Sequence, residues 1–188
     1  VYNLAHYKGR EFKVNLTEKV GNNIWYRGTL AGKTVWMHSS YVMAKPEIVE
    51  SSTSRLGHIK NSSVKIYETI GIESTAFEAG ETYFGSVYFI KKQAVFNNQT
   101  YYLISTSPSS TTGVVGWVNS TDVDTRTHVG VDKESKLFYI KGTGSAFNRA
   151  WGGSKNYVYD LAHYKGREFK VNLTEKVGND IWYRGILA

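Results

Sequence analysis

Residues 11–17 read EFKVNLT, and apolar and polar positions alternate along the whole stretch. Phe12, Val14 and Leu16 fall on one side of an extended chain, which is typical of a strand with one buried face. The sequence GNN follows at 21–23, and its glycine and asparagines tolerate the positive φ of a tight turn. The pattern predicts a strand that runs into a hairpin.

The same alternation continues beyond the turn. It resumes over Ile24–Gly28, and after Gly32 a further short strand is expected over Thr34–Met37. No segment has a convincing period of 3.6, so we expect little helix. Short strands joined by tight turns favour a small all-β barrel that is repeated along the chain.

The chain repeats itself. Residues 1–31 return as residues 158–188 with 28 of 31 positions identical, at an offset of 157. A fixed-period copy marks an array of modules, in which a repeated surface provides the function more often than one assembled pocket. We expect the chain to be a slice of a longer protein that starts inside one module and stops inside another.

A weaker repeat lies within the first. Residues 35–42, VWMHSSYV, align with 116–123, GWVNSTDV, at an offset of 81, and Ile24–Arg27 align with Thr100–Leu103. The repeating unit is therefore a pair of unlike modules of about 80 residues each. An insert rich in Ser, Thr and Pro at 105–110 is expected as an exposed loop.

These offsets set the expected boundaries. We expect the C-terminal part of a module at 1–43, a linker at 44–58, a complete module at 59–125 and a module lacking its C-terminal end at 126–188. The incomplete end modules could stay as open half-barrels or pair within or between molecules, because unpaired strand edges invite pairing.

Composition excludes several classes of protein. The 188 residues are 41% apolar and 14% aromatic, with two prolines and no cysteine. The chain can therefore bury real cores, is unlike a disordered linker, and has no disulfides. No apolar run approaches the roughly 20 residues that a membrane-spanning helix needs, and the first residues do not resemble a signal peptide.

Charge is uneven along the chain. The net charge is +7, of which residues 1–43 carry +4, residues 44–58 carry none, residues 59–124 carry −2 and residues 125–188 carry +5. The basic charge belongs to the copied module type, and the central module is mildly acidic. An anionic polymer is expected to contact the outer modules first.

Catalytic patterns are missing from the sequence. The five histidines lack metal-ligand spacing, a thiol nucleophile is impossible without cysteine, and no Gly-x-Ser-x-Gly elbow occurs. The stretch 142–147, GTGSAF, lacks the third glycine of a dinucleotide loop and is interpreted as a turn. We expect no catalytic residue, metal site or cofactor here.

The Gly116-Trp117 dipeptide, the preceding NQTYY at 98–102 and the pairing of unlike modules resemble the Gly-Trp (GW) repeats of staphylococcal major autolysins. The resemblance implies SH3-type half-open barrels beside the amidase and glucosaminidase domains of a bifunctional wall hydrolase. It further implies a secreted, non-catalytic targeting region at the Gram-positive cell wall that binds lipoteichoic and wall teichoic acid, with a role in adhesion to host matrix proteins. The first module departs from the motif, because Val35 precedes its Trp36.

Bases interleaved with aromatic residues give the candidate ligand-binding positions of the two copied modules. They are Lys8, Arg10, Lys13, Trp25 and Arg27, with Lys165, Arg167, Lys170, Trp182 and Arg184. Spaced cations suit the phosphates of a polyol-phosphate polymer, and the aromatic rings suit the polyol between them. One exposed contact contributes at most about 1 kcal/mol, so tandem modules are needed for useful affinity.

The tryptophans of the dipeptide motif, Trp36 and Trp117, are expected in the core, whereas Trp25 and Trp182 are left open between core and site. Three other binding functions are weighed. A Pro-rich peptide groove lacks its acidic loop, and peptidoglycan peptide is a direct alternative. The pI near 9.4 permits nonspecific binding of nucleic acid or heparin, and adhesion to host matrix proteins or heparin is a further alternative. No specific nucleic acid partner is expected.

Overall fold

The computed structural model describes residues 3–45 and 47–187, so Val1, Tyr2, Pro46 and Ala188 lie outside the described residues. The chain divides into two compact units, Val1–Glu47 and Ile48–Ala188. Both consist almost entirely of antiparallel strands, which confirms the all-β prediction. Within the described ranges, no helix is long and apolar enough to cross a membrane.

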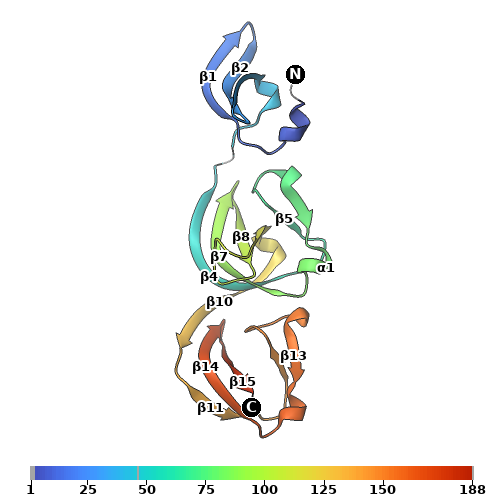
Figure 1. Cartoon of the computed structure of the whole chain (residues 1–188), viewed down its shortest axis with the longest axis vertical. Coiled ribbons are helices and arrows are strands. Elements are labelled where there is room, and N and C mark those ends of the chain that lie inside the picture. The colour runs from blue at the N-terminus through green and yellow to red at the C-terminus, as the bar shows by residue number, and fades with distance from the viewer. Residues whose placement is uncertain (1–2, 46, 188) are drawn as a thin grey trace. The chain divides into compact units, whose positions relative to one another are not determined.

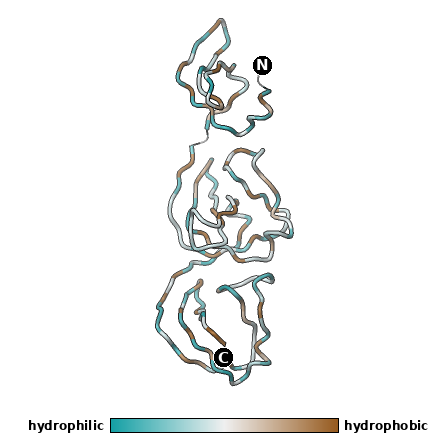
Figure 2. Tube along the Cα trace, in the orientation of Figure 1, coloured by the Kyte–Doolittle hydropathy of each residue, from teal (hydrophilic) through white to brown (hydrophobic). Residues whose placement is uncertain are grey.

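The first unit is a three-stranded antiparallel sheet in the order β1-β2-β3, flanked by two short 3-10 helices. Its elements are η1 (Leu4–Tyr7), β1 (Lys13–Val20), β2 (Asn23–Leu30), β3 (Lys33–His38) and η2 (Ser39–Tyr41). The three predicted strands and the turn at 21–23 are confirmed. The alternation of hydrophilic and hydrophobic positions on which the prediction rests can be followed along the trace in Figure 2.

The core of this unit is small. Leu30 and Met37 are its buried apolar residues among those described. Trp36 is 42% exposed, so its expected place in the core is wrong. The cause is the position of β3, which is an edge strand with no further strand beyond it in this sheet.

The central part of the second unit begins with a long strand. Its elements are β4 (Val49–Ile59), β5 (Lys65–Tyr67), η3 (Glu73–Thr75), β6 (Ala76–Glu78), α1 (Gly80–Tyr83), β7 (Val87–Phe96), β8 (Gln99–Ser105), β9 (Val114–Asn119) and η4 (Ser120–Asp122). Residues 49–58 therefore lie in β4, where a linker was expected. The first half of β4 is exposed and polar, which hides its alternation in the sequence.

Two apolar clusters fill the central part. One contains Ile66, Ile90, Ile104 and Val118, all fully buried, and the other contains Trp117 with Ile70, Ala94, Tyr101 and Leu103. Trp117 is 9% exposed, which confirms its expected place in the core. It is covered because β5 pairs with β9 and sets Tyr67 opposite Trp117. This covering strand distinguishes Trp117 from Trp36.

A single strand, β10 (Val123–Asp132), runs from the central part into the C-terminal part (Figure 1). Its first half pairs with β4 and its second half with β14. The expected module boundary at 125/126 therefore falls inside a strand. The remaining elements are β11 (Lys136–Tyr139), β12 (Ser145–Phe147), η5 (Ser154–Asn156), β13 (Tyr157–Asp160), η6 (Leu161–Tyr164), β14 (Glu168–Val177) and β15 (Asp180–Leu187).

The resulting ten-stranded sheet is open. Its order is β11-β14-β10-β4-β7-β8-β9-β5-β6, with β15 paired to β14, and β12 and β13 form a separate pair. The path ends on β11 and β6 rather than closing on itself. The half-open barrel that the resemblance to GW repeats implies agrees with this arrangement.

Buried side-chain hydrogen bonds connect the central and C-terminal parts of the second unit. Asn156 is buried, and its side-chain oxygen accepts hydrogen bonds from the backbone N–H groups of Val87 (2.9 Å) and Gly153 (3.1 Å), while its amide donates to Asn148 (2.9 Å). Gly153 is required here, because a Cβ on it would lie 2.3 Å from the Gly85 carbonyl oxygen. We call this contact region the junction.

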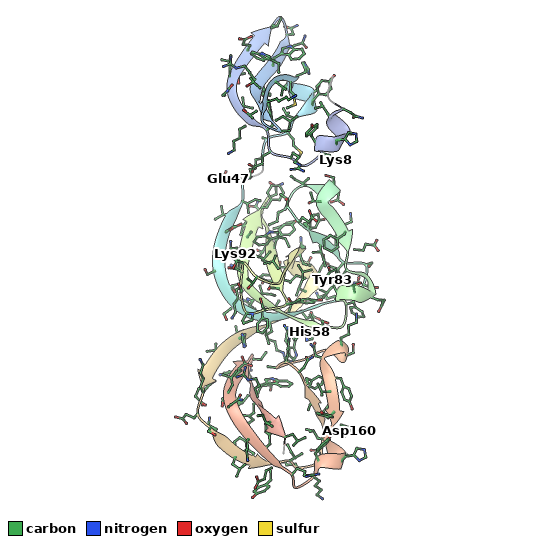
Figure 3. All side chains as sticks on the ribbon, in the orientation of Figure 1. Lys8, Glu47, His58, Tyr83, Lys92 and Asp160 are labelled. Carbon is green, nitrogen blue, oxygen red and sulfur yellow. The ribbon has the colours of Figure 1, made fainter. Side chains whose placement is uncertain are left out.

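His58 lies at the junction (Figure 3). Its Nε2 is 2.8 Å from the Trp151 carbonyl oxygen, and the two rings meet edge to face at 4.4 Å. The Arg126 guanidinium also lies over the Trp151 ring, 4.8 Å from its centroid. The central and C-terminal parts thus share a continuous strand, an aromatic contact and a buried hydrogen-bond network.

Candidate ligand-binding surface

The two 3-10 helices of the copied sequence, η1 and η6, position the first group of candidate cations. Each is capped by the preceding residue: the Asn3 side-chain oxygen accepts from Ala5 N (3.1 Å), and the Asp160 oxygen accepts from Ala162 N (2.9 Å). The Asn3/Asp160 exchange between the copies therefore preserves the cap. The chain then turns sharply, so the residues that follow are held on a defined loop.

That loop exposes two bases in each copy. Lys8 and Arg10 are exposed after η1, where Arg10 N donates to the Tyr7 carbonyl at 3.0 Å, and Lys8 lies at the edge of its unit (Figure 3). Lys165 and Arg167 are exposed after η6, held by the same 3.0 Å bond from Arg167 N to Tyr164 O. The repeated backbone geometry presents the repeated bases in the same way.

A second pair of bases lies on the strands. The Arg27 Nε donates to the Asn15 side-chain oxygen at 3.2 Å, and the Arg184 Nε donates to Asn172 at 3.0 Å. Each arginine is thereby held by a neutral partner and keeps its full charge and its terminal N–H groups. Arg27 also lies 6.0 Å from the centroid of the exposed Trp36 ring.

The candidate cations differ from the lysines of the central part in their pairing. Lys8, Arg10, Lys13, Lys165, Arg167 and Lys170 are all exposed, and none forms a salt bridge within residues 3–45 and 47–187. Lys60, Lys65 and Lys92 of the central part each pair with a carboxylate. The copied modules therefore carry exposed cations without a salt bridge, whereas the central-part cations without one among the described residues, Arg55 and Lys91, are half-buried and bonded to the hydroxyl groups of Thr125 and Ser54.

Glu11 illustrates how this availability arises. It directly follows Arg10 in the sequence, yet its carboxylate accepts a hydrogen bond from Lys45 at 2.8 Å. The Lys45 ammonium lowers the pKa of Glu11, and Glu11 raises the pKa of Lys45. Lys45 is the hydrogen-bond partner of this acid, whereas Lys13 acts on it only through its charge, and neither Arg10 nor Lys13 forms a salt bridge with it.

The two candidate tryptophans have different surroundings. Trp25 is half-buried and meets His38 edge to face at 5.3 Å, and His38 meets the exposed Tyr41 at 6.0 Å. Trp182 is half-buried against the junction cluster of Leu56, Val87 and Val177. The ring of Trp182 thus packs in the core of its unit, and the ligand contact expected for it stays a prediction.

The dipeptide motif has a structural role in the central part. Gly116 has φ +156°, and a Cβ there would lie 2.6 Å from Ile66 Cγ2 and 2.9 Å from the Tyr67 carbonyl oxygen. The glycine lets β5 approach β9 and cover Trp117. In the first unit the equivalent position is Val35, on an edge strand where no such approach is needed.

Sequence reasoning missed the charged group that joins β7, β10 and β14. His128 is buried, and its Nε2 lies 3.0 Å from a Glu175 oxygen and its Nδ1 3.5 Å from the Lys91 ammonium. The hydrogen bond with His128 lowers the pKa of Glu175, and burial lowers the pKa of Lys91. These residues come from distant segments, so no local signal reveals them.

The arrangement defines a class: small open β modules in tandem, with unpaired cations on exposed loops and strands. Within the described residues, no three His, Asp or Glu side chains are placed to hold a metal ion. The model of the GW (Gly-Tryp) dipeptide domain matches residues 1–43, 50–124 and 130–184, and the chain therefore belongs to this family. The matched domain is a non-catalytic, cell-wall binding module.

Relatives place this module in larger proteins. The chain is 25% identical over 193 residues to a bifunctional autolysin of Staphylococcus epidermidis, covering 93% of this chain and 14% of the relative. It is 19% identical over 198 residues to a bifunctional autolysin of Staphylococcus aureus, covering 94% of this chain and 15% of the relative. A solved chain described as an autolysin of Listeria monocytogenes is similar at a TM-score of 0.48 and 17% identity, over 97% of this chain and 77% of that chain.

Proposed function

We propose that this chain holds a wall hydrolase at the Gram-positive cell surface by binding lipoteichoic acid and wall teichoic acid through its basic modules. The observation that carries the proposal is the contrast in pairing. Six exposed cations of the copied modules have no salt-bridge partner among the described residues, while Lys60, Lys65 and Lys92 of the central part are neutralised.

A polyol-phosphate polymer matches such a surface physically. Each repeat of the polymer carries one negative charge, and exposed ammonium and guanidinium groups form charge-assisted hydrogen bonds to phosphate oxygens. Each contact contributes at most about 1 kcal/mol and is screened within roughly 8 to 10 Å at ordinary salt. Weak contacts repeated along one chain then combine, because binding by one module raises the effective concentration of the next.

We propose modules at 1–43, 59–125 and 126–188, with two changes to these boundaries. The strand β4 extends the central module back to Val49, and β10 joins the central and C-terminal modules. Secretion of the parent protein and its export to the wall belong to the same proposal, as do the ligand contacts of the ten candidate residues.

Retention on purified cell walls tests the proposal. The chain is incubated with walls that keep their teichoic acid and with walls from which it has been stripped, at low and at high salt. We expect retention on intact walls at low salt, and loss of retention both on stripped walls and at high salt. Equal retention on stripped walls would contradict the proposal and favour recognition of the peptidoglycan peptide.

A further inference from the structure

The central part contains a polar pocket that the cationic surface does not use. It is formed by β5 and the loop before it, by the start of β8, and by the end of β9 with η4. Its volume is about 330 Å³, and its lining includes Asn61, Tyr67, Gln99, Tyr101 and Asp122. The hollow is open to solvent, with Asn61, Lys65 and Gln99 exposed, and its volume is at the lower end of the range for small-molecule sites, roughly 300 to 1,000 Å³.

The hydrogen bonds within the lining show which polar groups are still free to bind a ligand. The Gln99 oxygen accepts from the Tyr101 hydroxyl (3.1 Å) and from the Asn119 amide (3.3 Å), which leaves the N–H₂ group of Gln99 as a donor. The Asn61 oxygen accepts from the N–H (3.1 Å) and hydroxyl (2.7 Å) of Ser63, which leaves the Asn61 N–H₂ group as a second donor.

Asp122 supplies an acceptor. Its carboxylate forms no salt bridge or side-chain hydrogen bond within the part of the chain that the structure describes. The lining thus contains two amide groups with donors left over and one carboxylate acceptor. Adjacent hydroxyl groups, each of which donates and accepts, satisfy such a mixed set.

The charge around the pocket disfavours phosphate. Lys65, the cation in its lining, forms a salt bridge with Glu73, and Glu73 also accepts a hydrogen bond from the Tyr67 hydroxyl at 3.3 Å. Residues 59–124 carry a net charge of −2. With Lys65 neutralised and Asp122 unpaired, an anion entering the pocket would be repelled.

Two tyrosine rings supply the apolar part of the lining. Tyr67 is half-buried and Tyr101 is 8% exposed, and the rings meet edge to face at 6.0 Å. Such a pair is rigid and presents C–H and π surface together with hydroxyl groups. The partly exposed Tyr67 ring beside two amides and a carboxylate is complementary to a neutral sugar ring, whose rim is hydroxylated and whose faces carry C–H groups.

The first unit keeps the frame of this site but changes its chemistry. His38 Nδ1 accepts from Ser40 N (3.2 Å), as the Asn119 oxygen accepts from Thr121 N (3.0 Å) in the central part. In the aligned sequences, however, Trp25, His38 and Tyr41 stand where Tyr101, Asn119 and Asp122 stand. The mixed donor and carboxylate set is therefore specific to the central module type, which points to a division of labour between unlike modules.

We infer that the central module binds a neutral pyranose sugar in the pocket lined by Tyr67, Tyr101, Gln99, Asn61 and Asp122. This inference rests on the proposed function for its biological meaning, because such sugars would be presented by the same cell-wall polymers. The sugar contacts themselves do not require phosphate. They add glycan selectivity to the charge attraction of the copied modules.

Nuclear magnetic resonance titration of the whole chain tests the inference. The probes are N-acetylglucosamine and methyl glucoside, with glycerol 3-phosphate as an anionic comparator, all at millimolar concentration. We expect one of the sugars to shift the backbone amide signals of Gln99, Tyr101 and Asn61, and glycerol 3-phosphate to leave them in place. No shift with either sugar, or a larger shift with glycerol 3-phosphate, would overturn the inference.

Matched variants locate the binding. Asp122→Asn removes the unpaired charge at constant size, and loss of its charged hydrogen bond is expected to weaken sugar binding about tenfold. Asp124→Asn removes a carboxylate that pairs with Lys60 outside the pocket and is expected to leave sugar binding unchanged. Equal effects of the two variants would refute the site, and unperturbed spectra of both confirm folding. Because the probes lack teichoic acid, this result is independent of the cell-wall retention experiment.

Discussion

Replacing Lys165, Arg167 and Lys170 by glutamine tests whether unpaired cations, rather than total charge, bind the proposed polymer. All three are exposed and lack a salt-bridge partner among the described residues, so the change should cost little stability. If each exposed contact contributes about 0.5 kcal/mol, the triple variant loses about 1.5 kcal/mol, which is roughly a tenfold rise in Kd. Titration calorimetry with purified lipoteichoic acid at low salt measures the change.

The chain provides a matched control for this variant. Replacing Lys60, Lys65 and Lys92 by glutamine lowers the net charge by the same amount, but these lysines already pair with Asp124, Glu73 and Glu50. We expect the control to change Kd by less than about twofold, because a paired cation contributes little to a new ion pair. Equal losses in the two triple variants would show that only net charge matters, and the reasoning from pairing would be refuted.

Three further predictions concern the folded unit itself. Asn156→Ala leaves the buried Val87 N–H without an acceptor and should lower the free energy of unfolding of residues 48–188 by about 2 to 4 kcal/mol. The exposed Asn172→Ala should lower it by less than about 0.5 kcal/mol, and urea denaturation measures both changes. Gly116→Ala should lower the free energy of unfolding by about 1 to 3 kcal/mol, because its Cβ would clash with β5. Gly130→Ala has open space for its Cβ and should leave the free energy of unfolding almost unchanged, so equal melting temperatures of the two variants would contradict this reasoning. Burial lowers the pKa of His58 below its ordinary value of 6.5, so stability is full above pH 6.5 and falls as pH drops below it; His58→Gln should flatten the dependence of melting temperature on pH between about 5 and 7.5.

The strands were predictable where alternation is local and regular. The stretch 11–17 and its partners after the turn gave three strands that the structure contains as β1, β2 and β3. The strand β4 was not predictable, because residues 50–54 are polar and exposed or half-exposed on both faces, so that they resemble a linker. Alternation of apolar and polar residues reveals a strand only when one of its faces is buried, so a strand that is exposed on both faces is missed.

The tryptophans show a second limit. Trp36 and Trp117 occupy equivalent positions in the aligned modules, yet one is 42% and the other 9% exposed. The difference comes from β5, which covers Trp117 and has no counterpart beyond β3 in the first sheet. Burial of a side chain on an edge strand depends on a distant segment, which local sequence does not reveal.

The net charge of each module was predictable, but which bases form salt bridges was not. The sequence gives the basic balance of the copied modules, but whether a base is paired depends on which strands lie side by side. Lys60, which directly follows β4, pairs with Asp124 on β10, and Lys92 on β7 pairs with Glu50 on β4. The junction and its Asn156 network were invisible for the same reason, because their partners lie far apart in the chain.

The most direct test of the central claim compares Kd values for purified lipoteichoic acid at low salt. The whole chain is measured beside the separate units, residues 1–47 and 48–188. We expect weak binding by each unit and binding by the whole chain that is tighter by about 10² or more, because linked basic modules bind one polymer together. A single unit that binds as tightly as the whole chain, or a whole chain that does not bind at all, would contradict it.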